Sequence, residues 1–457
     1  MTAHRLDYPI WDFADASGTG LLKWQEHFNL DDRKISRGLG SEVDDVGADL
    51  LDVAVAVYVV DRLCRRRPVG ARRDGQWWHR SLAIRLPLRS PSAWLETGAH
   101  ETLLKLLAWL TDDRWEVRLE DGLPRRSSDG QSTLFPDHLD RPVAASLFSG
   151  GLDSLLGADQ DLQGPGELVL VAAGTNGRMI GLQRDLVDGL SQIGPRRVRL
   201  VSLPVWLTAA GKKRLSCGEE SSQRTRGLLF ASMGAVVARA AGTNRLQIHE
   251  NGPGSLNLPM SSGQFGSMNT RAARPETLRM LGTMFSQLFG EPFELVNPSF
   301  WKTKAEMCRE ARRQIDPLIT KSVTCDTGLT RRVSEGQLCG YCTSCLLRRQ
   351  ALIAAGRSDL DDADRRQMIG DALAAQRQYA KPTALAMVSQ AADMSLCLSA
   401  GNPWSALVHR WPDLISVREA LDVDPAQLVA LLERYVTDWE KVRLPVVREM
   451  LPLRVAA

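Results

Sequence analysis

A short run between a strand-like and a helix-like segment has the composition of an anion-binding loop. Its residues are Ser149, Gly150, Gly151, Leu152, Asp153 and Ser154. Adjacent glycines let the backbone turn tightly and point successive N–H groups into one concavity. The helix that follows adds its N-terminal amides, and the two serines add hydroxyl donors. The loop therefore predicts a cradle for pyrophosphate or a similar anion.

The aspartate of this loop needs a different role from its neighbours. As a direct phosphate ligand Asp153 would repel the anion, so it fits better as a partner of Mg²⁺ or as a helix N-cap. The loop lacks the GxxxxGK[ST] pattern of a Walker-type site. Leu147 stands where a hydrolase nucleophile elbow needs glycine. The alternative to a binding loop is a plain Gly-rich turn capped by the aspartate.

The second chemical cluster is a group of cysteines, Cys325, Cys339, Cys342 and Cys345. Four thiolates are the number that tetrahedral zinc requires, and they leave no open position, so the spacing predicts a structural zinc site. An iron–sulfur cluster fits less well, because no further cysteine or proline follows Cys345 closely. Free thiols remain the other alternative. A disulfide framework would need an oxidising compartment.

Strands and helices alternate around the loop and predict a parallel α/β sheet. We expect strands at 142–148, 167–173, 197–203 and 245–249, with helices at 182–192 and 225–241. Ligands of such sheets bind at the carboxyl ends of the strands, which is where the loop falls.

The flanking segments have other patterns. Residues 49–64 predict a buried helix, 81–89 and 115–119 predict strands, 94–110 predict a helix, and 122–140 have the composition of a linker. From about residue 356 the patterns are helical. We expect an N-terminal α+β domain over 1–140, the α/β core over 141–355 and a helical region over 356–457.

Composition excludes several classes of protein. The chain has 457 residues, 44% of them hydrophobic and 24% charged, which is typical of globular proteins. Its net charge of +3 argues against direct nucleic-acid binding. The most apolar run, 53–60, is far shorter than the ~20 residues of a membrane span, and no signal peptide is visible. We therefore expect a cytoplasmic protein without a membrane segment.

Ser149-Gly150-Gly151-Leu152-Asp153-Ser154 after a strand resembles the signature of the N-type ATP pyrophosphatases, also called PP-loop enzymes. The resemblance implies an adenine nucleotide alpha hydrolase-like fold in which the loop binds ATP and the α-phosphate is transferred as AMP. The loop and the cysteines that follow it together make this sequence similar to the 7-cyano-7-deazaguanine synthases, the QueC family. This likeness covers about 141–355.

Further segments carry the likeness, and they imply roles for single residues. Arg224-Thr225-Arg226 opens a helix where the family has an Arg-Asn pair, Arg274-Pro275-Glu276 resembles its Arg-Pro-Glu, and Lys304-Ala305-Glu306 resembles its Lys-Ala-Glu. The implied catalytic residues are Asp153, Lys304 and Arg226, and the implied substrate-binding residues are Glu250, Asn251, Arg271, Arg274 and Glu276. Arginines suit carboxylate and phosphate, and a lysine can neutralise phosphate charge. Each cation taken singly could equally be a solvated surface charge.

The sequence also departs from the synthase pattern. Residues 174–178 replace the family's Tyr-Gly-Gln, and 250–254 replace its Asn-Ala-Glu-Asp substrate loop, so formation of the nitrile is in doubt. The long flanks resemble the QueC-like proteins of bacterial anti-phage systems, the QatC type and its relatives in type IV CBASS. Those proteins are associated with conjugating a deazaguanine to the N-terminal amine of a partner protein.

The resemblance therefore implies an AMP- and pyrophosphate-forming C–N ligase that uses ATP, Mg²⁺ and structural zinc. It implies a 7-deazaguanine carboxylate as substrate and a protein partner from the same defence operon. One alternative is a synthase that makes the nitrile from ammonia. A second is a tRNA-modifying PP-loop sulfurtransferase, which the charge of +3 disfavours. A degenerate nucleotide sensor is disfavoured because the whole loop is present.

Overall fold

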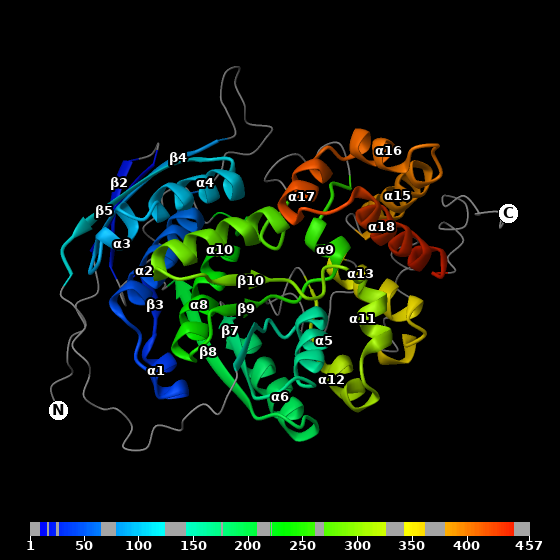
Figure 1. Cartoon of the computed structure of the whole chain (residues 1–457), viewed down its shortest axis with the longest axis horizontal. Helices are drawn as coiled ribbons and strands as arrows, with labels where there is room; N and C mark the ends of the chain where they lie inside the picture. The colour runs from blue at the N-terminus through cyan, green and yellow to red at the C-terminus, as the bar shows by residue number, and fades with distance from the viewer. Residues whose placement is uncertain are drawn as a thin grey trace.

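A computed structural model gives the fold of the chain (Figure 1). It describes residues 10–15, 18–23, 27–64, 79–123, 143–174, 177–207, 220, 222–260, 269–325, 342–361 and 380–442. At its centre is a six-stranded sheet of order β10-β9-β6-β7-β8-β3. Its parallel strands are β6 (Val143–Leu147), β7 (Glu167–Gly174), β8 (Val198–Leu207), β9 (Arg245–Gln247) and β10 (Glu294–Val296). The predicted parallel α/β sheet is thus confirmed.

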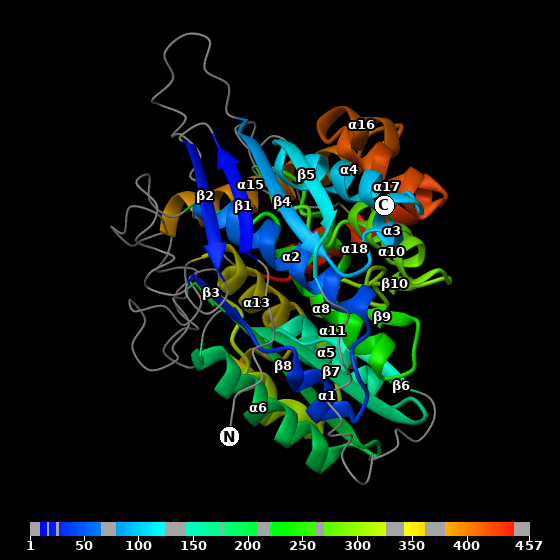
Figure 2. The ribbon, with the colours of Figure 1, turned by 90° about the vertical axis from the view of Figure 1, so that its left-hand side faces the viewer.

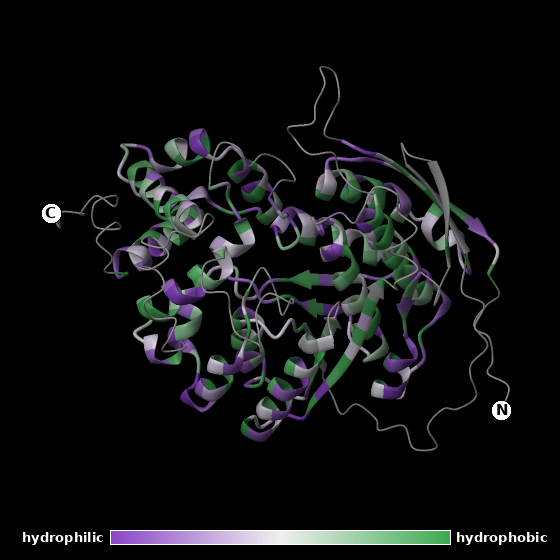
Figure 3. Ribbon diagram, turned by 180° about the vertical axis from the view of Figure 1, so that it is seen from behind, coloured by the Kyte–Doolittle hydropathy of each residue, from purple (hydrophilic) through white to green (hydrophobic). Residues whose placement is uncertain are grey.

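Side chains of the buried strand β7 alternate between two hydrophobic layers. Val169 and Val171 pack with α8 (Arg226–Ala240) and α10 (Pro275–Phe289) on one face. Leu168 and Leu170 pack with α5 (Leu152–Asp161) and α6 (Gly177–Ile193) on the other. A strand that is apolar on both sides is what a sheet covered by helices on both faces requires. Figure 3 shows hydrophobic residues along the strands and on the helix faces turned toward them.

The N-terminal residues form a second sheet of order β2-β1-β4-β5 (Figure 2). Its strands are β1 (Ile10–Asp15), β2 (Gly18–Lys23), β4 (Ser81–Leu88) and β5 (Arg114–Asp121), with β4 and β5 parallel. The helix predicted over 94–110 is divided into α3 (Ser92–Leu95) and α4 (Ala99–Thr111). The break falls at Gly98, whose φ of 83° does not fit a right-handed helix.

The N-terminal block and the central sheet share one hydrophobic core. The predicted buried helix is present as α2 (Asp45–Leu63), and it packs on α8. In addition, β3 (Phe28–Leu30) pairs antiparallel with β8 and becomes the edge strand of the central sheet, and α1 (Arg33–Leu39) follows it. The domain boundaries at 140 and 355 stay predictions, and most of the predicted linker lies outside the described residues.

The C-terminal region is helical, as predicted. It contains α15 (Ala380–Leu398), α16 (Pro403–Arg410), α17 (Asp413–Leu421) and α18 (Pro425–Glu440). Their hydrophobic core also includes Leu256, Phe300 and Leu346 of the central region. The central region also contains shorter helices, which are α9 (Gly252–Leu256), α11 (Lys304–Glu310), α12 (Asp316–Lys321) and α13 (Thr343–Ala354). Within the described residues, no helix combines the length and apolar character that a membrane crossing requires.

Candidate nucleotide site and cysteine cluster

The Gly-rich loop follows the end of β6 and continues into the first turn of α5, at the carboxyl edge of the sheet. The Ser149 and Ser154 hydroxyls are 3.1 Å apart, and the Gly151 N–H donates to Ser149 Oγ at 3.2 Å. Gly150 has a φ of 81°, and a Cβ there would lie 3.3 Å from Cγ of Gln183. The turn therefore requires glycine for both its backbone conformation and its packing.

Neighbouring segments hold the loop in this shape. The Leu152 N–H donates to Thr324 Oγ1 at 2.9 Å, and the Val323 N–H donates to the Gly150 carbonyl at 3.2 Å. From the other side, Gln183 Nε2 donates to the Ser149 carbonyl at 3.2 Å. Because these contacts orient the loop backbone, a bound anion would not have to order it.

Predicted site residues from separate elements meet next to the loop. Lys304 Nζ, at the start of α11, lies 2.6 Å from Asp153 Oδ2. Asn251 Nδ2, from the segment after β9, donates to Asp153 Oδ1 at 3.1 Å and to Glu250 Oε1 at 3.0 Å. Asp153, Asn251 and Lys304 are buried, whereas Glu250 is partly exposed. We call these four residues the Asp153 cluster.

The ionisable side chains of the Asp153 cluster do not all carry a charge at neutral pH. Burial and the neighbouring Asp153 carboxylate together raise the pKa of Glu250 to about 8, although Lys304 opposes the change. Burial disfavours the charged form of Lys304, yet Asp153 and Glu250 together raise the pKa of Lys304 above its usual value. Below pH 8 the cluster therefore holds an Asp153–Lys304 ion pair beside a protonated Glu250.

Glu250→Gln is expected to remove part of the pH dependence of stability. Because the pKa of Glu250 is raised to about 8 in the folded state, the folded chain binds more protons than the unfolded chain from about pH 4.3 upward. Stability therefore falls as pH rises through this window. Between pH 5 and pH 8 the stability of the variant relative to the wild type should therefore increase by roughly 1–3 kcal/mol.

Thermal unfolding between pH 5 and 9 measures this difference. The exposed Glu294, paired with Arg245, supplies the matched control Glu294→Gln. A gap between Glu250→Gln and wild type that stays constant with pH would contradict the assignment.

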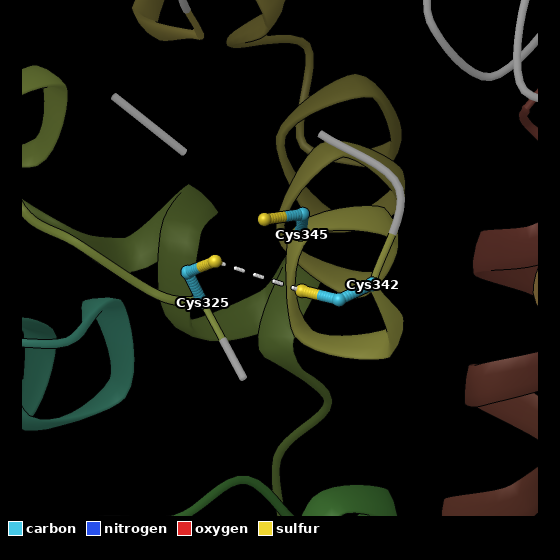
Figure 4. Close-up of side chains that lie close together, drawn as sticks. All are labelled: Cys325, Cys342 and Cys345. Carbon is cyan, nitrogen blue, oxygen red and sulfur yellow. Dashed lines mark hydrogen bonds between the residues drawn. The ribbon is translucent and has the colours of Figure 1, made fainter. Parts of the chain in front are cut away.

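Three of the predicted zinc ligands lie together (Figure 4). The Sγ atoms of Cys325, Cys342 and Cys345 are all within 4.8 Å of one another, and those of Cys325 and Cys342 are 3.9 Å apart. Zn–S bonds of ~2.3 Å in a tetrahedron separate sulfurs by ~3.8 Å, so the donor set fits zinc. Cys339 lies outside the described residues. Such an ion would supply a structural crosslink.

The cysteine cluster and the Gly-rich loop share Thr324. Its carbonyl oxygen is 3.4 Å from Cys345 Sγ, and its hydroxyl accepts the hydrogen bond from the Leu152 N–H. Because Thr324 directly precedes Cys325 in the chain, a metal held by the cysteines would also fix the hydroxyl that orients the loop.

Cys342→Ser is expected to lower bound zinc from one equivalent per chain to well below half and the thermal midpoint by about 10 °C. Affinity for ATP should fall with it, because without the metal Cys325 would no longer be held and its neighbour Thr324 would orient the loop less well. Elemental analysis and calorimetry measure these quantities. Cys397→Ser is the control, since Cys397 lies on α15 outside the cluster. Full zinc occupancy in Cys342→Ser would refute the ligand set.

The other predicted substrate residues lie at the start of α10 and join separate parts of the chain. Arg274 Nη2 is 2.9 Å from Glu276 Oε1, and Arg274 Nη1 is 2.6 Å from Asp413 Oδ2 on α17. The Arg271 guanidinium lies 4.2 Å from the ring centroid of Trp109 on α4. No hydrogen bond or ion pair found among the described residues joins these three to the Asp153 cluster. Their substrate roles stay predictions.

Arg226 begins α8 and is exposed, with Nη1 donating to Gln223 Oε1 at 3.3 Å. The preceding Thr225 is anchored from the N-terminal block, because Asp61 on α2 accepts hydrogen bonds from both its N–H and its hydroxyl. No hydrogen bond or ion pair found between described residues joins Arg226 to the Asp153 cluster. Its catalytic role stays a prediction.

Sequence reasoning missed residues that orient the site, notably Thr324, Gln183 and Thr303. Thr303-Lys304-Ala305-Glu306 has the S/T-x-x-E pattern of a capping box, a signal that the sequence did contain. In the structure, Thr303 and Glu306 form that box and so fix where α11 begins. Thr324 and Gln183 have no such local signal.

Comparison with known proteins adds one match. Residues 224–356 match the family model described as Queuosine biosynthesis protein QueC. That segment contains Asn251, Lys304 and the cysteine cluster, whereas the Gly-rich loop precedes it. No curated protein matches the sequence. The family match supports a QueC-like protein, and it points to ATP-dependent PP-loop chemistry related to 7-cyano-7-deazaguanine synthesis.

Proposed function

We propose that the protein is an ATP-dependent C–N ligase that adenylates the carboxylate of a 7-deazaguanine and transfers the acyl group to an amine. The proposed amine is the N-terminus of a partner protein, and the proposed setting is anti-phage defence in the cytoplasm. The observation that carries the ATP step is the Asp153–Lys304 pair beside the Gly-rich loop. The family match supports the deazaguanine class of substrate.

In the first step the loop amides and hydroxyls bind the β- and γ-phosphates of ATP. A carboxylate oxygen of the substrate attacks the α-phosphorus, the bond to the bridging oxygen breaks, and pyrophosphate leaves. Two anions must approach one another, which is costly unless cations and N–H dipoles surround them. Lys304 provides the nearby positive charge, and Asp153 keeps this amine charged and oriented.

In the second step an amine displaces AMP from the acyl adenylate and forms an amide. An amine that arrives as an ammonium ion must lose a proton before it can attack. Glu250 is the partly exposed member of the Asp153 cluster, and the raised pKa of Glu250, about 8, suits proton transfer near neutral pH. We therefore assign the ionised form of Glu250, whose fraction grows as the pH rises toward 8, as the proton acceptor.

ATP would arrive as its Mg²⁺ complex, which adds positive charge at the phosphates. Both carboxylate oxygens of Asp153 are engaged, one by Lys304 and the other by Asn251. We therefore assign Asp153 to the orientation of Lys304, and no step is assigned through the ion.

Two features support a protein as the acceptor. The N-terminal sheet and the C-terminal helices lie beyond the segment that the family model matches. A protein acceptor needs a docking surface of ~800 Å² per partner, which such additions can provide. With ammonia as the amine, the product would be an amide and, after a second ATP, the nitrile.

The acceptor is tested by mass spectrometry of partner candidates encoded by adjacent genes. Each candidate is incubated with the enzyme, ATP, Mg²⁺ and 7-carboxy-7-deazaguanine, and its intact mass and N-terminal peptide are measured. We expect one deazaguanine acyl group on the N-terminal amine of the partner. The same partner with this amine acetylated beforehand should carry none. Formation of free nitrile from ammonium, with no modified protein, would replace the ligase with the synthase.

A further inference from the structure

The helix that carries Lys304 begins with a complete capping box. The Thr303 hydroxyl accepts a hydrogen bond from the Glu306 N–H at 3.1 Å, and Glu306 Oε2 accepts one from the Thr303 N–H at 2.8 Å. Lys304 is the first residue of α11, directly after this cap. The geometry of the cap therefore sets where the Lys304 side chain leaves the backbone.

Helix α18 contacts both residues of this capping box, Thr303 and Glu306. Asp438 Oδ2 on α18 accepts a hydrogen bond from the Thr303 hydroxyl at 2.5 Å, and both residues are buried. One turn earlier on α18, Arg434 Nε lies 2.9 Å from Glu306 Oε1. Asp438 also has Lys441 at 3.4 Å and Arg309 at 3.6 Å. The C-terminal region thus contacts the cap with two charged side chains spaced i, i+4.

The same helix confines the segment that supplies Glu250 and Asn251. A Cβ on Gly252 would lie 2.6 Å from Leu431 of α18 and 2.1 Å from the Phe300 carbonyl. The Gly252 N–H donates to the Lys302 carbonyl at 2.8 Å, which ties this segment to the approach to α11. Figure 1 shows α18 (red) beside α9 and α13, and these contacts are present in the structure.

We propose that α18 is a positioning element of the ATP site, and that Asp438 orients Lys304 through the hydroxyl of Thr303. Asp438 does not contact the reacting atoms and acts through the cap. The expected effect of Asp438 on turnover rests on the proposed function. The expected effect of Asp438 on the position of Lys304 does not. It gives the C-terminal helical region a part in catalysis that is separate from any docking of a partner.

Kinetics test the proposal through a set of matched variants. Asp438→Ala and Thr303→Val each remove the bond, and each should lower kcat for pyrophosphate release about 10- to 100-fold, because small misplacements of a catalytic group have effects of this size. The KM for ATP should change by less than about threefold, because Lys304 acts mainly in the transition state. Asp438→Asn and Thr303→Ser keep an acceptor and a hydroxyl, and should stay within about threefold of wild type.

The control is Thr437→Ala. Thr437 neighbours Asp438 on α18, and its hydroxyl donates to the Glu433 carbonyl within the same helix. This variant should leave kcat unchanged. Equal losses in Thr437→Ala and Asp438→Ala would show that α18 affects only stability and would overturn the positioning role.

A second readout does not depend on turnover. Trace acetylation with acetic anhydride, followed by peptide mass spectrometry, measures the reactivity of Lys304 relative to the half-exposed Lys321. Burial and the ion pair with Asp153 make Lys304 slow to react in the wild type. Asp438→Ala should raise its relative rate at least about fivefold, since a misplaced amine is more accessible. Should Asp438→Ala fail to fold, Thr303→Val tests the same bond.

The two readouts separate the possible failures. If the wild type releases no pyrophosphate but the acetylation of Lys304 rises in the folded variants, the proposed function fails and the positioning stands. If Lys304 keeps its wild-type reactivity in folded Asp438→Ala and Thr303→Val, the positioning is overturned whatever the activity is.

Discussion

Lys304→Met should reduce kcat for pyrophosphate release by about 10³-fold, because removing one preorganised group that stabilises transition-state charge has an effect of this size. Lys304 is buried, 2.6 Å from Asp153 at the end of the Gly-rich loop. Methionine keeps most of the apolar stem of the side chain and removes the ammonium group with its charge and its donors. Rapid quench with ³²P-labelled ATP measures the chemical step directly.

The single variant also leaves Asp153 buried without its cation, which should destabilise the fold by about 3–5 kcal/mol. The double variant Asp153→Asn/Lys304→Met removes both charges, so its thermal midpoint should return toward that of the wild type. Its activity should stay low. Recovery of turnover together with stability would show that the pair is structural and that Lys304 has no role in the chemistry.

Gly150→Ala should weaken ATP binding at least about 100-fold, because the loop can no longer keep the backbone that presents its amides. Gly150 has a φ of 81°, and the added methyl would lie 3.3 Å from Gln183, the residue that anchors the loop carbonyls. Isothermal titration with a non-hydrolysable ATP analogue measures the change.

Gly290→Ala is the matched control for backbone strain. Gly290 ends α10 with a φ of 69°, and nothing lies within 4 Å of a Cβ built there. It should lose about 1 kcal/mol of stability, as an L-residue forced into this region does, with ATP affinity unchanged. Tight ATP binding by Gly150→Ala would show that ATP binding does not depend on the conformation of the loop.

Local patterns were sufficient to predict the central architecture. The strands predicted at 142–148 and 167–173, the buried helix at 49–64 and helices in the described part of the C-terminal region, 380–442, are all present. These elements depend on periodicity and composition within a short window, which a sequence displays directly. Even so, the helix predicted over 94–110 is broken at Gly98, where the left-handed backbone needs a glycine that helices otherwise tolerate poorly.

Long-range pairing was not predictable in the same way. β3 completes the central sheet from outside the predicted core, and a three-residue edge strand carries almost no signal of its own. Asp438 lies 135 positions from Thr303, and Thr324 lies 172 positions from Leu152. Their site roles depend on the packing of whole elements, so no spacing rule in one sequence identifies them.

The resemblance to the QueC family named some site residues that the structure brings together and others that it does not. Asp153, Glu250, Asn251 and Lys304 do come together. By contrast, Arg274 is bonded to Glu276 and Asp413, so its charge is neutralised within the protein. An arginine suits a carboxylate of the protein as well as one of a ligand, and the sequence does not show which it meets.

Pyrophosphate release is the most direct test of the central claim. Purified protein is mixed with ATP and Mg²⁺, with and without 7-carboxy-7-deazaguanine, and the pyrophosphate and the acyl adenylate are quantified. The account predicts release only when the deazaguanine is present, and its loss in Lys304→Met. Release at the same rate without the deazaguanine, or no release with it under any condition, would contradict the account.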